Sequence, residues 1–325
     1  MHASSVSRRL FGLALLAAVT VSAAGCGSTG GHGQDGQGAA GPSAFATLHG
    51  GPSHDQIALP ADAYAFDVSE RDRALLARAV TIGECLHGFG YPYDLAAEKA
   101  ENAATVRKDL MDFGRYDNKR RYMVTDPVAA ARYGYHLVST VVGAGGTDGA
   151  SGLGDLGTAE KRVLYGADEK NAPVTRTRQG KPIPPGGCAA TGDEAVAGKS
   201  GPFGEATAVA SLRSASFQQS REDPEVVAAT HAWSACMAAR GHTLSDPLGD
   251  PGFDIDKPTV SPAESAMAKD DARCKQQTHL VDLWFASEVD YQRRWIASHQ
   301  ADFTAAKADH DETMKRVALV LAAAR

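Results

Sequence analysis

Residues 223–241 read DPEVVAATHAWSACMAARG and predict the helix that decides the class of fold. Asp223-Pro224 is a helix start, because aspartate caps a helix N-terminus and proline is tolerated at the first helical position. The apolar positions that follow recur at helical spacing and are Val226, Thr230, Trp233 and Met237. Gly241 ends the segment. One face of this helix should therefore pack into a core, with Cys236 beside it.

The same start and stop signals recur on both sides of this helix. Helices are predicted from Ser69 to Gly88, Leu95 to about Phe113, Pro127 to about Tyr135, Thr158 to Gly166, Glu205 to about Gln219 and onward from Ser261-Pro262. From about Val281 to the end the chain has neither proline nor glycine, which predicts one or two long helices. The run Leu137 to Val142 is the best strand candidate. The predicted fold is mainly α, a disulfide-stapled helical domain with long C-terminal helices and at most a minor strand element.

A heptad pattern marks the C-terminal segment. Its two rows are Ile296, Phe303, His310 and Val317, and Lys307, Met314 and Leu321. His310 and Lys307 interrupt the apolar character of these rows, so the pattern predicts a face that packs two helices together more than a coiled coil.

The N-terminus has the organisation of an export signal. Arg8 and Arg9 precede an apolar run from Leu10 to Val21, which is too short for a transmembrane helix that needs about 20 apolar residues. The run ends in Ala23-Ala24-Gly25-Cys26, which resembles the bacterial lipobox. That resemblance implies that Cys26 is diacylated and becomes the first mature residue. The run from Ser7 to Leu13 also resembles a twin-arginine signal, and the general secretory route remains equally open.

This export signal sets the expected domains and location. Residues 1–25 are the predicted signal peptide, 26–58 a lipidated, Gly/Ser-rich flexible tether, and 59–325 a helical domain that could comprise two similar halves, about 59–200 and 201–325. The mature protein would be anchored by membrane lipid on Cys26 to the outer face of the cytoplasmic membrane. Loss of Arg8 and Arg9 would move the formal net charge from -6 to -8. An acidic, exported chain has no electrostatic reason to bind nucleic acid.

Four cysteines remain after Cys26. In an oxidising compartment they imply two disulfides, and the sequence alone allows three pairings. The preferred pairs are Cys85–Cys188 and Cys236–Cys274, because CLHGFGY at 85–91 and CMAARGH at 236–242 share one pattern of cysteine, apolar residue, glycine and ring. Each of these cysteines would end a helix and take the next cysteine along the chain.

Other chemistries are less well supported. His231, Cys236, Cys274 and His279 contain the residue types of a zinc site, but positions five apart on a helix do not converge. Asp250, Asp254 and Asp256 share one loop without the ligand order of an EF-hand. No metal site is predicted. The sequence Gly152 to Gly157 spells G-x-G-x-x-G but does not follow a strand directly, so no dinucleotide or other cofactor is predicted.

One resemblance goes beyond the leader. The segment HAWSACM at 231–237 with Gly241, AKDDARCK at 268–275, and the terminal helix with Glu288 and Tyr291-Gln292 resemble a group of actinobacterial exported surface lipoproteins. The group shares a W-x-x-C-M-x-x-x-G helix and an A-x-x-D-x-x-C helix. The resemblance implies an exported helical lipoprotein of unknown function and supplies no catalytic residue.

Two functions are expected from these observations, and catalysis is the less expected property. There is no G-x-S-x-G, no H-E-x-x-H and no P-loop, so no catalytic residue is proposed. The first expectation is a non-catalytic binding or accessory component of the cell envelope, whose partner is an envelope protein or peptidoglycan. The alternative is a solute-binding lipoprotein of an ABC-type importer, although such receptors usually alternate strands with helices.

Overall fold

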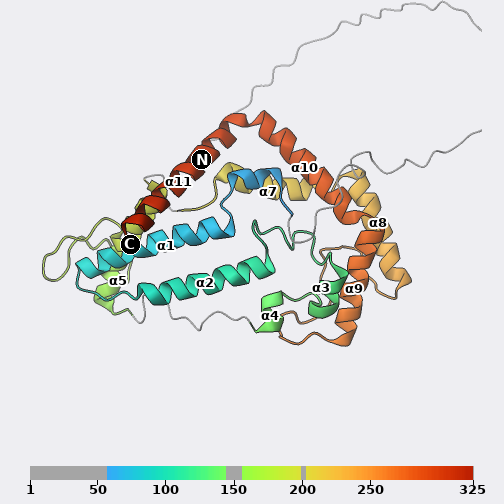
Figure 1. The fold of residues 1–325 in the computed structure, drawn as a ribbon, viewed down its shortest axis with the longest axis horizontal. Helices are drawn as coiled ribbons and strands as arrows, with labels where there is room; N and C mark the ends of the chain where they lie inside the picture. The colour runs from blue at the N-terminus through green and yellow to red at the C-terminus, as the bar shows by residue number, and fades with distance from the viewer. Residues whose placement is uncertain (1–56, 144–155, 199–202, 325) are drawn as a thin grey trace, which may run out of the picture. The chain divides into compact units, whose positions relative to one another are not determined.

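The computed structural model describes residues 57–143, 156–198 and 203–324, all within one compact unit of the chain. Cys26, the leader and nearly all of the tether lie outside the described residues. Within them the structure is helical and contains no strand (Figure 1). The elements are η1 (Pro60–Tyr64), α1 (Val68–Gly88), α2 (Leu95–Asp112), α3 (Pro127–Tyr133), α4 (Val138–Val142), α5 (Thr158–Tyr165), α6 (Gly187–Ala197), α7 (Thr207–Ser220), α8 (Pro224–Ala239), α9 (Pro262–Gln277), α10 (Leu280–Ser298) and α11 (Gln300–Ala323). The predicted helical fold class is confirmed.

Three helices begin with proline directly after a capping side chain. Asp126 and Asp223 each accept a hydrogen bond from the backbone N–H two residues on, and Ser261 accepts one from Glu264 N. The predicted start of α1 at Ser69 was wrong by two residues. Asp67 is the N-cap, and its carboxylate accepts from Glu70 N at 2.7 Å while Glu70 accepts from Asp67 N. An aspartate thus takes the role in the capping box that the prediction gave to serine.

The strand predicted for Leu137 to Val142 is wrong, because this run forms the short helix α4. Two features favour the helix. Asp112 accepts hydrogen bonds from both the backbone N–H and the hydroxyl of Ser139, in the first turn. Gly143 then closes the helix in the left-handed conformation, with φ 67°. A short apolar run is compatible with a strand or a helix, and here the interactions at its two ends favour the helix.

Helix α1 occupies the centre of the N-terminal part and packs against α2, α6 and α11 (Figure 1). Its contact with α6 is antiparallel, because Arg78 pairs with Asp193 while Cys85 bonds to Cys188. Gly192 makes this close approach possible. A Cβ at that position would lie 2.7 Å from Ile82 Cγ1 and 3.0 Å from the Arg78 carbonyl oxygen. On the other side of the unit, α3 packs against α9, and α10 contacts α7 and α8.

The C-terminal segment forms two helices, α10 and α11, that meet at His299 (Figure 1). The predicted heptad face exists on α11, where Phe303 and Val317 are buried. It does not pack mainly against α10, as expected of a two-helix pair. Phe303 instead packs near η1 and α7, and Val317 packs near α1 and α6. The regular spacing therefore corresponds to one buried face of α11 that packs against several other elements.

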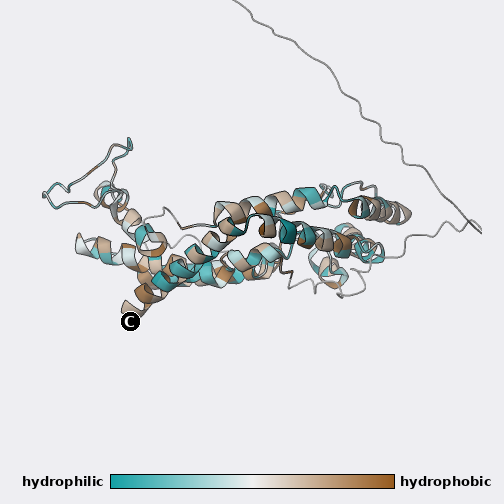
Figure 2. Ribbon diagram, turned by 90° about the horizontal axis from the view of Figure 1, so that it is seen from above, coloured by the Kyte–Doolittle hydropathy of each residue, from teal (hydrophilic) through white to brown (hydrophobic). Residues whose placement is uncertain are grey.

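Hydrophilic and hydrophobic residues are mixed along the helices (Figure 2). In the described part of the chain, no helix is long and apolar enough to cross a membrane. Within the described ranges, the buried apolar residues gather into five clusters. The largest surrounds Trp233 and Trp284, and the second surrounds Leu86 and Cys188.

Candidate functional site

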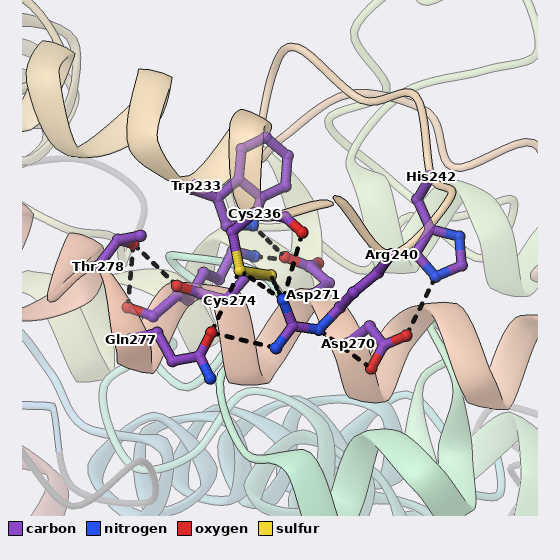
Figure 3. The surroundings of a disulfide bond; sticks show 10 residues. Trp233, Cys236, Arg240, His242, Asp270, Asp271, Cys274, Gln277 and Thr278 are labelled. Carbon is purple, nitrogen blue, oxygen red and sulfur yellow. Dashed lines mark hydrogen bonds and ion pairs between the residues drawn. A yellow bond between two sulfur atoms is a disulfide. The ribbon is translucent and has the colours of Figure 1, made fainter. Parts of the chain in front are cut away.

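The Cys236–Cys274 disulfide joins the C-terminal turns of α8 and α9 (Figure 3). Beside it, the indole Nε1 of Trp233 donates to Asp271 Oδ1 at 2.8 Å. Asp271 Oδ2 in turn lies 3.2 Å from Lys275 Nζ, which also donates to the carbonyl oxygens of Tyr122 and Val124 at 3.1 Å each. Trp233, Asp271 and Lys275 are all buried. Burial lowers the pKa of Lys275, while the adjacent carboxylate offsets part of that effect.

Arg240 covers the outer side of this disulfide (Figure 3). Its guanidinium lies 2.8 Å from Cys236 Sγ, donates to Gln277 Oε1 at 3.1 Å, and is 3.6 Å from Asp270. His242 contacts the same Asp270 at 3.2 Å. Access to the sulfur atoms is therefore restricted by an ion-paired side chain.

The second disulfide joins Cys85 of α1 to Cys188 of α6, so both disulfides are the predicted pairs. The sequence similarity around Cys85 and Cys236 corresponds to one local structure. In each case the residue directly after the turn glycine donates its N–H back to the helix, from Tyr91 to Leu86 O and from His242 to Met237 O. Gly90 and Gly241 have φ 83° and 85°, which favours glycine. The similarity ends there, because Cys188 begins its helix whereas Cys274 lies near the end of its own.

Glu288 forms a second buried polar network. Its carboxylate is paired with Arg121 and accepts hydrogen bonds from Tyr122 and Ser216 at 2.8 Å each. Gln292 continues the network, donating to Ser216 Oγ at 2.8 Å and accepting from Ala61 N at 2.9 Å. Both Glu288 and Gln292 are fully buried.

These two networks explain the sequence pattern without a reaction. The resemblance noted above includes four of these residues, Trp233, Asp271, Glu288 and Gln292. Each forms a hydrogen bond or ion pair with a residue of another element. Their side chains are enclosed, so a substrate could not reach them without local opening. The motifs therefore specify how the helices join.

The remaining residues singled out from sequence do not converge. His231 and His279 are exposed, and their partner cysteines are bonded to each other. Among the described residues no group of three or more histidine, cysteine or acidic side chains is placed to hold a metal ion. Asp254 pairs with Lys257 at 2.8 Å. Most of the Gly152–Gly157 motif lies outside the described residues.

The aromatic and histidine candidates on the C-terminal helices also serve packing. Trp233 and Trp284 belong to one apolar cluster, whereas Trp295 is partly exposed and stacks on His299 with ring centroids 4.3 Å apart. His310 stacks on Phe66 and contacts Glu70 at 3.2 Å. These residues do not line one shared cavity.

A cavity of about 320 Å³ lies between α5 and the loop that leads to α6. Three arginines line it: Arg162 from α5, and Arg176 and Arg178 from the loop. Two isolated bridges shape this loop, Ala167 with Pro173 and Arg176 with Pro182. The floor is apolar and is formed by Val163, Val174 and Ile183, the first and last of which are buried. The arrangement is a basic rim around an apolar floor, and we call it the arginine cavity.

The charges of the arginine cavity are not matched by acids in its wall. No aspartate or glutamate lines it. Arg176 donates to the carbonyl oxygen of Gly180 at 2.8 Å, which is a neutral partner. The Nε of Arg162 is buried and has no hydrogen-bond partner among the described residues. Asp168, the nearby acid that senses Arg162, has its pKa lowered first by accepting from the N–H groups of Ala172 and Lys170. Its carboxylate is therefore engaged elsewhere.

The surrounding segment has the opposite charge to the chain as a whole. Residues 158–183 carry six basic and three acidic side chains, within a chain of formal net charge -6. Planar guanidinium groups bind carboxylate and phosphate with paired hydrogen bonds. The arginine cavity can therefore hold an anionic group. The arginines are up to 16 positions apart and form no local motif, so the excess of basic residues in this segment is the sequence signal for the cavity.

The comparisons with known proteins found no matching protein family, no similar curated protein and no similar solved structure.

Proposed function

We propose that this protein is an exported, lipid-anchored and non-catalytic binding component of the cell envelope, and that its ligand places an anionic group in the arginine cavity. Export and anchoring on Cys26 are inferred from the leader sequence. The observation that carries the binding role is the cluster of Arg162, Arg176 and Arg178 around one cavity that has no acid in its wall. The Nε of Arg162 is a buried donor without a partner, which favours a ligand that supplies an acceptor.

The partner is an envelope component that carries carboxylate or phosphate groups, of which peptidoglycan and an acidic envelope protein are the two forms considered. The importer alternative has less support. The described residues contain no sheet, whereas solute receptors usually alternate strands with helices. The domain also presents its basic site as one small cavity in a loop-and-helix segment.

Anion binding is tested by titration calorimetry of the mature chain carrying Cys26→Ser, with citrate and inorganic phosphate as probes. Each charge-assisted hydrogen bond contributes about 1.5–3 kcal/mol, so Arg162→Gln or Arg176→Gln should weaken binding by at least about tenfold. Arg293→Gln removes an exposed arginine of α10 and is the matched control, expected to leave affinity unchanged. Equal affinity in all variants, or no saturable binding by the wild type, would refute the assignment.

The cellular partner is tested by placing a photo-crosslinking residue at Gln179, which is exposed and lines the arginine cavity. Crosslinks to peptidoglycan fragments or to an envelope protein, lost in an Arg162→Gln background, would support the proposal. A permease complex would favour the importer. Crosslinking no higher than in a Cys26→Ala strain would contradict an anchored envelope role.

A further inference from the structure

The Cys236–Cys274 disulfide has two polar side chains beside its sulfur atoms (Figure 3). One guanidinium nitrogen, Nη1 of Arg240, lies 2.8 Å from Cys236 Sγ and 3.2 Å from Cys274 Sγ. The amide oxygen of Gln277 lies 3.3 Å from Cys236 Sγ. This disulfide is therefore in contact with a cationic donor and with a neutral acceptor.

The Cys85–Cys188 disulfide has apolar surroundings instead. Both cysteines belong to the cluster around Leu86, Cys188 as a buried member and Cys85 as a partly buried one. Among the described residues, neither of their sulfur atoms has a hydrogen-bond or ion-pair partner. This disulfide also closes the longer loop, with a sequence separation of 103 against 38, which makes its reduction less favourable in the chain-entropy model.

The polar groups beside Cys236–Cys274 suit the reduced cysteines better than the disulfide. A disulfide sulfur carries no proton, so it cannot donate to Gln277 Oε1. After reduction, Cys236 as a thiol can donate to that oxygen. Cys274 can be a thiolate, which the adjacent guanidinium of Arg240 stabilises. Stabilising the reduced form makes a disulfide easier to reduce, and this equilibrium does not depend on the route of the reaction.

The charge of Arg240 is only partly balanced by its neighbours. Its ion pair with Asp270 is 3.6 Å long, and Asp270 also contacts His242 at 3.2 Å. The other partner of the guanidinium, Gln277, is neutral. Arg240 therefore retains positive charge for a thiolate at Cys274.

The two sulfur-bearing residues differ in exposure. Cys274 is 0% exposed, whereas Cys236 is half-buried beside the exposed Gln277. Arg240 covers this side with one side chain that is itself 28% exposed. An entering thiolate is thus expected to attack Cys236, with Cys274 as the leaving group.

We propose that Cys236–Cys274 is a reversible redox site that a dithiol reductant reduces while Cys85–Cys188 stays oxidised. A thiolate of the reductant attacks Cys236 Sγ, a mixed disulfide forms there, and the electron pair of the broken S–S bond leaves on Cys274 Sγ. The second thiol of the reductant then attacks its own sulfur in the mixed disulfide. Cys236 leaves as a thiolate that takes up a proton, and the reductant ends as a disulfide, so two electrons pass to the protein.

This reduction leaves other contacts between α8 and α9 in place. Trp233 Nε1 still donates to Asp271, and Asp271 still pairs with Lys275. The helical fold should therefore persist in the reduced protein. The site uses no residue of the arginine cavity, so it stands independently of the proposed anion-binding role.

The equilibrium is tested with mixtures of reduced and oxidised dithiothreitol. The mature chain carries Cys26→Ser, which removes the fifth cysteine. Alkylation and peptide mass spectrometry then give the reduced fraction of each disulfide separately. Cys236–Cys274 should reach half reduction at a ratio of reduced to oxidised reagent at least tenfold lower than Cys85–Cys188, which corresponds to about 30 mV. Equal ratios, or reduction that occurs only together with loss of the helical spectrum, would overturn the proposal.

Two variants separate the polar contacts from loop length. Arg240→Gln removes a charge-assisted hydrogen bond to the thiolate and should raise the ratio for Cys236–Cys274 about tenfold. Gln277→Ala removes the acceptor of the Cys236 thiol and should raise it about fivefold. Arg273→Gln is the matched control, because Arg273 is an exposed arginine next to Cys274 in the chain. If neither Arg240→Gln nor Gln277→Ala differed from this control, the assigned role of the two side chains would be wrong.

The direction of attack is tested with glutathione, a monothiol that cannot complete the second step. The mixed disulfide should be found on the peptide that contains Cys236. A glutathione adduct mainly on Cys274 would contradict the proposed order of bond breaking.

Discussion

Replacing Glu288 with glutamine should be among the most destabilising single changes in this protein. Glu288 is 0% exposed and its partner Arg121 has a side chain 13% exposed. Glutamine has the same shape but no charge, so Arg121 would be left with a buried guanidinium and no carboxylate. Removing one partner of a buried ion pair costs about 3–5 kcal/mol. Because the amide can still accept from Tyr122 or Ser216, we expect about 3 kcal/mol.

The assay is urea unfolding followed by circular dichroism, together with calorimetry of the same chain. For a domain of this size, about 3 kcal/mol corresponds to a fall in Tm of about 6–12 °C. Glu205→Gln is the control, because Glu205 pairs with Arg213 at 2.9 Å in the same region but is 29% exposed. Partly exposed pairs of this kind contribute less than about 1 kcal/mol.

A double-mutant cycle separates the ion pair from other effects. Arg121→Gln combined with Glu288→Gln removes both charges, so the double variant should lose clearly less stability than the two single variants added together. The reasoning would be refuted if Glu288→Gln cost no more than Glu205→Gln, or if the two single losses simply added.

Three further perturbations test other parts of the fold. Replacing both cysteines of a disulfide with alanine should cost about 4 kcal/mol for Cys236–Cys274, whose sequence separation is 38, and nearly 5 kcal/mol for Cys85–Cys188, whose separation is 103, measured by denaturant unfolding. Gly134→Ala should cost at least about 1–3 kcal/mol, because alanine disfavours φ 57° and its Cβ would displace Glu264; no loss of Tm would contradict this geometry. Burial raises the pKa of Asp62 from 3.8 to about 6, so the folded state binds this proton more tightly than the unfolded state does. The protonated carboxyl group therefore stabilises the fold at low pH, and this stabilisation is lost as the pH rises from about 4 to 6. The free energy of unfolding of Asp62→Asn, relative to that of the wild type, should therefore rise by up to about 3 kcal/mol between pH 4 and pH 7, as measured by urea unfolding. A difference that does not change with pH would contradict this pKa.

Local signals in the sequence predicted most of the helices because those signals are physical parts of helix ends. Asp223-Pro224 and Ser261-Pro262 each supply a capping acceptor and a residue with a fixed φ, and both start helices. The same reasoning failed at Leu137 to Val142, where the deciding hydrogen bonds come from Asp112, which is 27 positions away from Ser139. A rule that reads neighbours along the chain cannot include such a contact.

The candidate sites were less predictable than the helices. Arg162, Arg176 and Arg178 meet only because a loop with two isolated bridges folds back beside α5. Conversely, Trp233 and Glu288 stood out in the sequence because each must meet a specific polar partner in the interior. The distinctive residues of this sequence therefore mark buried contacts between helices more than binding surfaces.

The positions of these buried polar contacts follow from how the apolar core is divided. In the part of the chain that the structure describes, the buried apolar residues form five clusters, and polar side chains connect some of them. Lys275 reaches from the Trp233 cluster to Val124 of a neighbouring cluster. Gln292 similarly connects Ser216 to Ala61 of the cluster around Phe303.

A small cluster contributes little burial on its own, so its neighbours must be held in a fixed relation to it. Directional hydrogen bonds and disulfides provide that relation, because they fail when a helix slides or rotates by a few ångströms. Each disulfide accordingly belongs to one of the two largest clusters. On this reasoning the buried polar residues set the registration of the helices.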